Sequence, residues 1–324
     1  MLGAIIGDIV GSRWEFNPTN DYHFEWLSKE NSFTDDTICT VAVADALLHE
    51  RDFGDAMHDW CNRYPYPMGG YGGRFAGWVH SSHPVPYNSF GNGAAMRVSP
   101  VAHWFNDEQQ MLEAAAATAL PTHNHPEGVK GAQTVALAIF KAMQYNHHCY
   151  QEAPKHIDEI INDCVAFSGY DIDMPKSSVQ NRFDETCQGT VPVALKIISL
   201  STCFEDAVRL AVSLGADADT LGAIVGSIAE AIWGIPFKMR RDIEAYLPGE
   251  MQDVLRAFRL ARPESFKPLI DTTYSGDDFS DVSWDALYDI EGKEAYEQQM
   301  NEAKAEKENR RLQMLERGKA RLTW

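Results

Sequence analysis

Two acidic clusters that contain threonine form the clearest chemical pattern in the sequence. Residues 34–37 read Thr-Asp-Asp-Thr and directly precede an apolar pattern with helical spacing, and residues 217–220 read Asp-Ala-Asp-Thr and precede another. Carboxylate and hydroxyl oxygens are hard donors, which suit Mg²⁺, Mn²⁺ or Ca²⁺ better than Zn²⁺. Four aspartates brought together would repel one another, and one or two divalent cations would offset that repulsion. The alternative is that each cluster only caps its helix.

Glu15 is a candidate for proton transfer because it lies between Trp14 and Phe16. An apolar setting raises the pKa of a carboxyl group, and a raised pKa is typical of a carboxyl that transfers a proton. The alternative is an exposed glutamate on the surface. Both an acid and a base role stay open at this stage.

Residues 64–93 are rich in Gly, Pro and aromatic residues, so we expect a long ordered loop here rather than a regular helix. Its aromatic side chains offer flat faces to a planar ligand, or the loop only covers the core. At its end lie two glycines before a predicted helix start, where backbone N–H groups can meet a phosphate. This second pattern consists of Phe90, Gly91, Asn92 and Gly93.

A pair of histidines precedes another predicted helix. His123 and His125 are two residues apart, and Pro126 follows them near the first helical turn. The pair can bind or orient a ligand, or it can satisfy neighbouring backbone groups. The motifs of the common serine hydrolases, zinc proteases and P-loop enzymes do not occur in the sequence.

The elements that position these residues are predicted to be helices. Apolar residues recur at steps of three and four, and strand-like alternation is nearly absent, so the sequence predicts an all-α domain over residues 1–265. Small residues near the N-terminus, at Gly3, Gly7 and Gly11, allow close packing of helices. The predicted helices span 35–50, 127–145, 190–201, 204–214 and 220–233.

Composition excludes several classes of protein. The chain has 324 residues, 44% of them hydrophobic, which is enough for a substantial core. Its formal net charge of -19 argues against nucleic acid as a partner. Apolar stretches are too short for a membrane span. Six scattered cysteines and the absence of a signal-peptide pattern predict a cytoplasmic protein with reduced thiols.

The C-terminal part is predicted to be an appendage. Residues 266–290 are acidic and rich in turn formers, and residues 291–324 read as a charged helix with few apolar positions. Such a helix is either solvated or docks on a partner chain. We therefore divide the chain into a domain at 1–265 and an appendage at 266–324; the pattern assigns no oligomeric state.

Taken together, five segments make the chain resemble the ADP-ribosylglycohydrolase family. The resemblance implies an all-α domain of orthogonally packed helices with a cleft for two Mg²⁺ or Mn²⁺ ions. It also implies hydrolysis of a glycosidic bond between ADP-ribose and an acceptor. The segments are GAIIGDIVGSRWEF at 3–16, FTDDT at 33–37, FGNGAAMRVSP at 90–100, THNHPEGVKGA at 122–132 and GADADTLGAIVGSIAEAIWGIP at 215–236.

The resemblance assigns roles to individual positions. Glu15, Asp36 and Asp219 are implied to be catalytic, with Glu15 moving the proton. Phe90 is expected to stack on adenine, the residues after it to meet the diphosphate and ribose, and His123 to lie near the ribose. The implied substrate-binding residues are Phe90, Gly91, Asn92, Gly93 and His123, and the implied metal ligands are Thr34, Asp35, Asp36, Asp217, Asp219 and Thr220.

The chain departs from the family pattern in a few places. Ala216 and Ala218 replace a glycine and a threonine, and Glu230 lies where small residues are common. The expected substrate is an ADP-ribosylated protein, modified on arginine or serine. The alternatives are a protein that binds ADP-ribose without catalysis or has a structural role, and a hydrolase of a small ADP-ribose conjugate.

Overall fold

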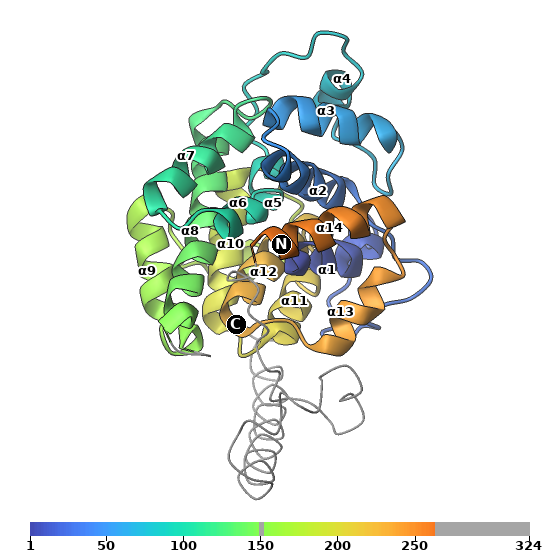
Figure 1. Ribbon diagram of the computed structural model, residues 1–324. Coiled ribbons are helices and arrows are strands. Elements are labelled where there is room, and N and C mark those ends of the chain that lie inside the picture. Colours follow the sequence, from blue (N-terminus) through green and yellow to red (C-terminus); the bar gives the residue numbers. More distant parts are fainter. Residues whose placement is uncertain (149–151, 263–324) are drawn as a thin grey trace, which may run out of the picture. The chain divides into compact units, whose positions relative to one another are not determined.

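The computed structural model describes residues 1–148 and 152–262, which belong to the first of two units of the chain, Met1–Lys267. All regular elements in these ranges are helices, so the prediction of an all-α domain is confirmed (Figure 1). They are α1 Leu2–Gly11, α2 Asp35–Leu48, α3 Phe53–Arg63, α4 Gly73–Val79, α5 Gly93–Met96, α6 Ser99–Trp104, α7 Glu108–Ala119, α8 Pro126–His148, α9 Ile157–Ser168, α10 Cys187–Leu200, α11 Phe204–Val212, α12 Ala218–Trp233, α13 Phe237–Glu244 and α14 Gly249–Ala261, with short 3-10 turns η1 Ser12–Trp14, η2 Ala153–Lys155 and η3 Lys176–Ser178.

The five helices predicted from apolar spacing correspond to α2, α8, α10, α11 and α12. The expectation that residues 64–93 lack a regular helix is wrong, because α4 lies within them. Its apolar residues Phe75, Trp78 and Val79 are spaced three and four apart and are all buried, so packing of one face outweighs the low helix propensity of the neighbouring glycines.

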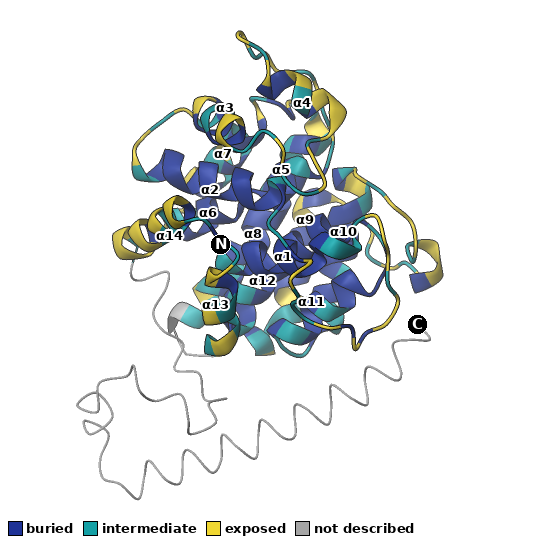
Figure 2. Ribbon diagram, turned by 90° about the vertical axis from the view of Figure 1, so that its right-hand side faces the viewer, coloured by how far each residue is buried: buried dark blue, intermediate teal, exposed yellow. Residues whose placement is uncertain are grey.

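Helix α12 lies at the centre of the domain. Figure 2 shows it buried along most of its length, and it packs against α1, α8, α10 and α11. A helix that is apolar all round is expected in such a position. Because α12 begins directly after Asp217, the fold anchors the second acidic cluster in the middle of the core.

Helix α1 contacts α12 through glycine on both sides. A Cβ atom on Gly7 would lie 1.9 Å from the carbonyl oxygen of Gly222, and one on Gly3 would lie 2.2 Å from that of Gly226. No side chain fits at this spacing, so the prediction of close helix packing from the small residues of α1 is confirmed. The contact fixes Asp8 on α1 beside the start of α12.

Glu230 links α12 to Met1 and Gly3 by an ion pair and hydrogen bonds. Its Oε2 lies 2.5 Å from the Met1 ammonium and accepts a hydrogen bond of 2.8 Å from the backbone N–H of Gly3. The ammonium also lies 2.9 Å from His103 Nε2 on α6. Glu230 therefore has a structural partner at a position where the family pattern has small residues.

Two predictions concern the chain beyond residue 262. The acidic segment and charged helix expected at 266–324, and the boundary after residue 265, lie outside the described residues and stay predictions.

Among the helices that are described, none is both long enough and apolar enough to cross a bilayer.

Candidate metal centre and substrate cleft

The first acidic cluster is held by Asp8, a residue to which the sequence analysis assigned no role. Its carboxylate accepts hydrogen bonds from the backbone N–H of Thr34 at 3.0 Å and of Thr37 at 3.1 Å. It also accepts the hydroxyl groups of Thr34 at 2.7 Å and Thr37 at 2.5 Å. These four bonds fix the first turn of α2, where Thr34 is the N-cap as predicted and Asp36 N–H donates to its hydroxyl oxygen. The sequence signal that could have pointed to Asp8 was its position as a charged residue inside the apolar, glycine-spaced helix α1.

The second acidic cluster is not explained by helix capping. Asp217 is the N-cap residue of α12 but makes no side-chain capping bond. Its Oδ2 instead accepts a 2.7 Å hydrogen bond from Asn92 Nδ2. Thr220, in the first turn, donates to Asp36 Oδ2 at 3.3 Å and so links the two clusters directly. Capping alone therefore accounts for part of the first cluster and for none of the Asp217 side chain.

The two clusters meet in groups of carboxylate oxygens that could hold a metal ion. One group joins Asp8, Asp36 and Asp219, and another joins Glu15, Asp217 and Asp219, with the oxygens of each group within 4.8 Å of one another. Oδ1 of Asp36 and Oδ1 of Asp219 are buried and have no hydrogen-bond partner. Buried carboxylate oxygens without donors are costly unless a cation neutralises them, so the donor set fits divalent metal ions.

The electrostatics of the cluster agree with this geometry. Burial, and then the nearby carboxylates, raise the pKa of Asp35 to about 7 and hold the pKa of Asp36 and of Asp219 well above the usual range. Burial also raises the pKa of Asp217 to about 6. Within the described ranges, these carboxylates form no ion pair with Lys or Arg. Positive charge is what the site lacks.

Glu15 lies at the edge of this cluster, directly after η1. Burial raises its pKa to about 8, and the next causes are the charges of Asp217 and Asp35. The direction expected from the sequence is therefore correct, with burial as the largest cause. Of the two aromatic neighbours, Trp14 packs against Phe24, while Phe16 is 71% exposed, and the neighbouring carboxylates add to the effect of burial.

A turn of the 64–93 segment packs against the Glu15 carboxylate. Gly69 has a φ of 77°, and a Cβ atom there would lie 2.4 Å from Glu15 Oε2. Only glycine accepts both this conformation and this approach. The segment therefore covers one side of the proton-transfer candidate as well as part of the core.

His123 lies beside the glycine-rich segment that precedes α5. A Cβ atom on Gly91 or on Gly93 would lie 3.2 or 3.3 Å from the His123 ring. The hydroxyl oxygen of Thr122 accepts a 2.8 Å hydrogen bond from Arg97 and lies 2.7 Å from His123 Nδ1. The Thr122 hydroxyl therefore engages Nδ1 and leaves Nε2 on the side of Gly91 and Gly93. Burial and the charges of Arg97 and Arg74 lower the pKa of His123, so the ring is neutral.

The backbone before α5, where a phosphate contact is expected, is partly engaged within the protein. Asn92 N–H donates to the carbonyl oxygen of Glu185 at 2.7 Å, and Gly91 N–H donates to Ser89 Oγ at 3.1 Å. These two groups are engaged within the protein, and α5 has only four residues. The expectation that backbone N–H groups of this segment meet a phosphate stays a prediction, and the bridge between Gly91 and Thr186, before α10, shows that part of this backbone is already engaged.

Cationic and aromatic side chains gather on the His123 side of the cleft. Arg74 stacks on Tyr87 at 4.9 Å and donates to its carbonyl oxygen, and the Tyr87 ring lies 6.2 Å from that of His123. Neither Arg74 nor the buried Arg97 forms an ion pair with a described residue. Phe90 is 42% exposed and meets His125 edge to face at 5.3 Å.

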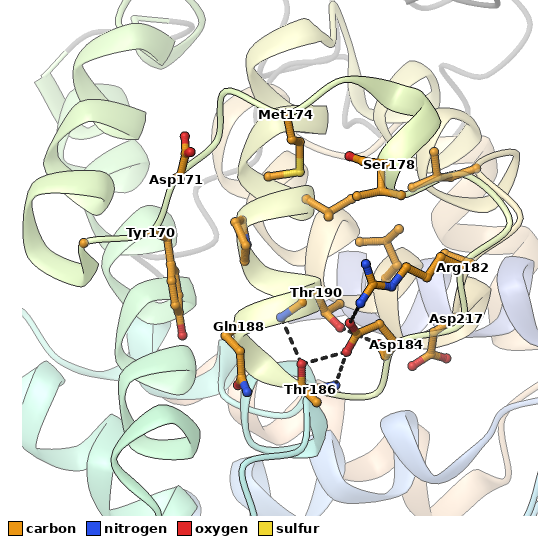
Figure 3. Close-up of a pocket in the computed structure, with 18 residues that line it drawn as sticks. Tyr170, Asp171, Met174, Ser178, Arg182, Asp184, Thr186, Gln188, Thr190 and Asp217 are labelled. Atoms are coloured by element: carbon orange, nitrogen blue, oxygen red, sulfur yellow. Dashed lines mark hydrogen bonds and ion pairs between the residues drawn. The ribbon is translucent and has the colours of Figure 1, made fainter.

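A cavity of about 630 Å³ borders the acidic cluster. It lies between the segment before α10 and the start of α12, with Tyr170, Met174 and Leu221 among its apolar lining. Figure 3 shows Asp184 and Asp217 close together at one end, where Asp184 also lies 3.7 Å from Arg182. The cleft thus continues past Asp217 into a cavity that no motif in the sequence indicated.

Comparison with known proteins identifies the family. The model of the family described as ADP-ribosylglycohydrolase matches residues 1–267, so the chain belongs to this family. Mouse ADP-ribosylhydrolase ARH3 is 25% identical over 329 residues, covering 79% of this chain and 88% of ARH3. ADP-ribosylarginine hydrolase Tri1 of Pseudomonas putida (strain GB-1) is 25% identical over 280 residues, covering 72% of this chain and 70% of Tri1.

A solved structure supports the fold. A chain described as an ADP-ribosylglycohydrolase-related protein complex superposes with a TM-score of 0.56 at 23% identity, covering 80% of this chain and 95% of that chain. Family membership supports a hydrolase that acts on an ADP-ribose conjugate. The resemblance inferred from the five segments is therefore confirmed.

Proposed function

We propose that this protein hydrolyses the glycosidic bond that joins ADP-ribose to an arginine or serine side chain of a modified protein. The observation that carries the proposal is the convergence of two distant acidic clusters around carboxylate oxygens that have no donor. The unpaired Arg74 and Arg97 beside His123 support an anionic ligand such as a diphosphate. We also propose a cytoplasmic location, which the scattered cysteines favour.

Two divalent ions, Mg²⁺ or Mn²⁺, would be held by oxygen atoms of both clusters. When bound, such ions hold ribose hydroxyl groups and lower the pKa of a water molecule. Asp8 keeps the first turn of α2 in place for this purpose, and Asn92 fixes one oxygen of Asp217. The proposed ligands are Thr34, Asp35, Asp36, Asp217, Asp219 and Thr220.

The remaining groups of the cleft bind the substrate and move protons. A water oxygen bonds to the anomeric carbon while the bond from that carbon to the acceptor breaks; the water loses one proton and the acceptor gains one. Glu15, partly exposed and beside the cluster, carries one of these protons. Nε2 of His123 contacts the ribose or the diphosphate, and Phe90 offers its exposed face to adenine.

The test is release of ADP-ribose from arginine- and serine-modified peptides, followed by chromatography. We expect release with Mg²⁺ or Mn²⁺, loss of release in EDTA, and recovery on adding metal. Asp36→Ala and Asp219→Ala are expected to lose both metal binding and release. No release from either peptide with either metal contradicts the proposal.

A further inference from the structure

Two exposed phenylalanines form a pair at the rim of the cleft. Phe16 is 71% exposed and Phe183 is 45% exposed, and their rings stack with centroids 6.0 Å apart. Exposed aromatic rings that touch each other, but that the core does not cover, mark candidate contact surfaces. Phe16 directly follows Glu15, so the pair adjoins the proton-transfer candidate.

The pair is held by two segments that are anchored to the turn before α12. Asn20 Nδ2 donates to the carbonyl oxygen of Ser213 at 3.1 Å, and Asn181 N–H donates to that of Leu214 at 3.0 Å. A Cβ atom on Gly215 would lie 2.3 Å from Asn181 Oδ1 and 2.8 Å from Asn20 Nδ2. The two aromatic rings are therefore fixed relative to the acidic cluster that starts at Asp217.

The charge around the pair is negative. Glu185 is exposed and forms no ion pair with any described residue, while its charge contributes to raising the pKa of Glu15. Asp184 is paired with Arg182, so Glu185 is the neighbouring carboxylate without an ion-pair partner among the described residues. Aromatic faces attract cations, and an unpaired carboxylate does the same. This surface therefore suits a lysine or arginine side chain.

The two rims of the cleft differ in sign. The exposed Arg74 lies on the His123 side without a carboxylate partner, whereas the Phe16 side carries the exposed, unpaired Glu185. A diphosphate is attracted to the first rim and repelled by the second. The part of the substrate that meets Phe16 and Phe183 is thus the acceptor.

We propose that Phe16, Phe183 and Glu185 form a docking surface for a basic segment of the ADP-ribosylated protein, where lysine or arginine residues that flank the modified side chain bind. The inference rests on the proposed function and adds the class of acceptor. It excludes a small conjugate as the best substrate, because such a conjugate has no flanking residues to fill this surface.

The test compares matched peptides that carry one ADP-ribosylated residue, arginine or serine, flanked by lysine, alanine or glutamate. For the wild type, we expect kcat/KM to be about tenfold higher with lysine than with glutamate flanks. The double change Phe16→Ala/Phe183→Ala is expected to lower kcat/KM for the lysine peptide about tenfold. Glu185→Gln is expected to lower the ratio of kcat/KM for the lysine peptide to kcat/KM for the alanine peptide, whatever its effect on the absolute rates.

Free ADP-ribose is the matched ligand because it lacks the acceptor, and its inhibition constant should stay within about twofold in all variants. Phe167→Ala is the matched variant, since Phe167 is also an exposed phenylalanine, 41% exposed on α9. Equal turnover of all three peptides, or no effect of the double change, overturns the docking surface. If the double change also weakens inhibition by free ADP-ribose, the two rings contact ADP-ribose rather than the acceptor. That result overturns the docking surface as well. If the wild type releases nothing from any peptide, the proposed function itself fails.

Discussion

Asp219→Asn should make the metal-free protein more stable while removing its response to metal. The Asp219 carboxylate has an oxygen within 4.8 Å of carboxylate oxygens from Asp8 and Asp36, and another grouping brings in Glu15 and Asp217. Two unit charges at this separation repel by about 3 kcal/mol at an effective dielectric constant of 20. Loss of a carboxylate near a helix N-terminus costs about 0.3–1 kcal/mol. The relief of repulsion between carboxylates is therefore larger than the loss of the favourable interaction with the helix N-terminus.

The expected size follows from these two terms. The raised pKa values mean that the cluster shares protons, so we count only one ionised neighbour and expect a net gain of about 2 kcal/mol at pH 8. This gain corresponds to a rise in Tm of about 4–8 °C. With metal at 100 times its Kd, the wild type should gain about 2.7 kcal/mol and the variant little, because a neutral amide replaces a charged ligand.

The assay is thermal unfolding of both proteins in EDTA and in excess Mg²⁺ at pH 8. Asp206→Asn is the matched control, since Asp206 is also a buried aspartate in a first helical turn but accepts bonds from Tyr22 and Thr202 at 2.7–2.9 Å. That variant should lose stability in both buffers. A lower Tm of Asp219→Asn in EDTA, or an undiminished response to Mg²⁺, refutes the electrostatic reasoning.

Three further predictions concern the site and its support. The pKa values of about 8 for Glu15 and about 7 for Asp35 lie above their unfolded values, so protons stabilise the metal-free folded state and compete with metal; calorimetry should show Mg²⁺ affinity rising from pH 6.5 to 8.5, and a flat profile would contradict this linkage. Arg74→Gln should weaken ADP-ribose binding about tenfold and leave adenosine binding unchanged, because only the former carries phosphate; equal losses for both ligands would argue against a phosphate contact. Gly7→Ala should lower the Tm sharply because its Cβ would lie 1.9 Å from Gly222 O, whereas Gly77→Ala, in open space, should not; similar Tm values for the two variants would mean that α1 and α12 separate freely.

Much of the fold was predictable because it depends on local periodicity. Apolar residues at steps of three and four identified α2, α8, α10, α11 and α12, and Thr34 was correctly expected as a helix N-cap. Helix α4 was missed since two glycines within it lower its intrinsic propensity, and only burial of Phe75 and Trp78 against the rest of the domain makes it form.

By itself, the sequence determined which chemical groups the protein has and which of them lie at helix starts. It contained the two acidic clusters, the glycine stripe of α1 and the family pattern, because these are properties of neighbouring residues. The tertiary structure alone decided that Asp8 would hold Thr34 and Thr37, that Asn92 would bond to Asp217, and that Phe16 would stack on Phe183. Those contacts join residues far apart in the chain, and their distances depend on how closely the helices pack, which no local pattern specifies.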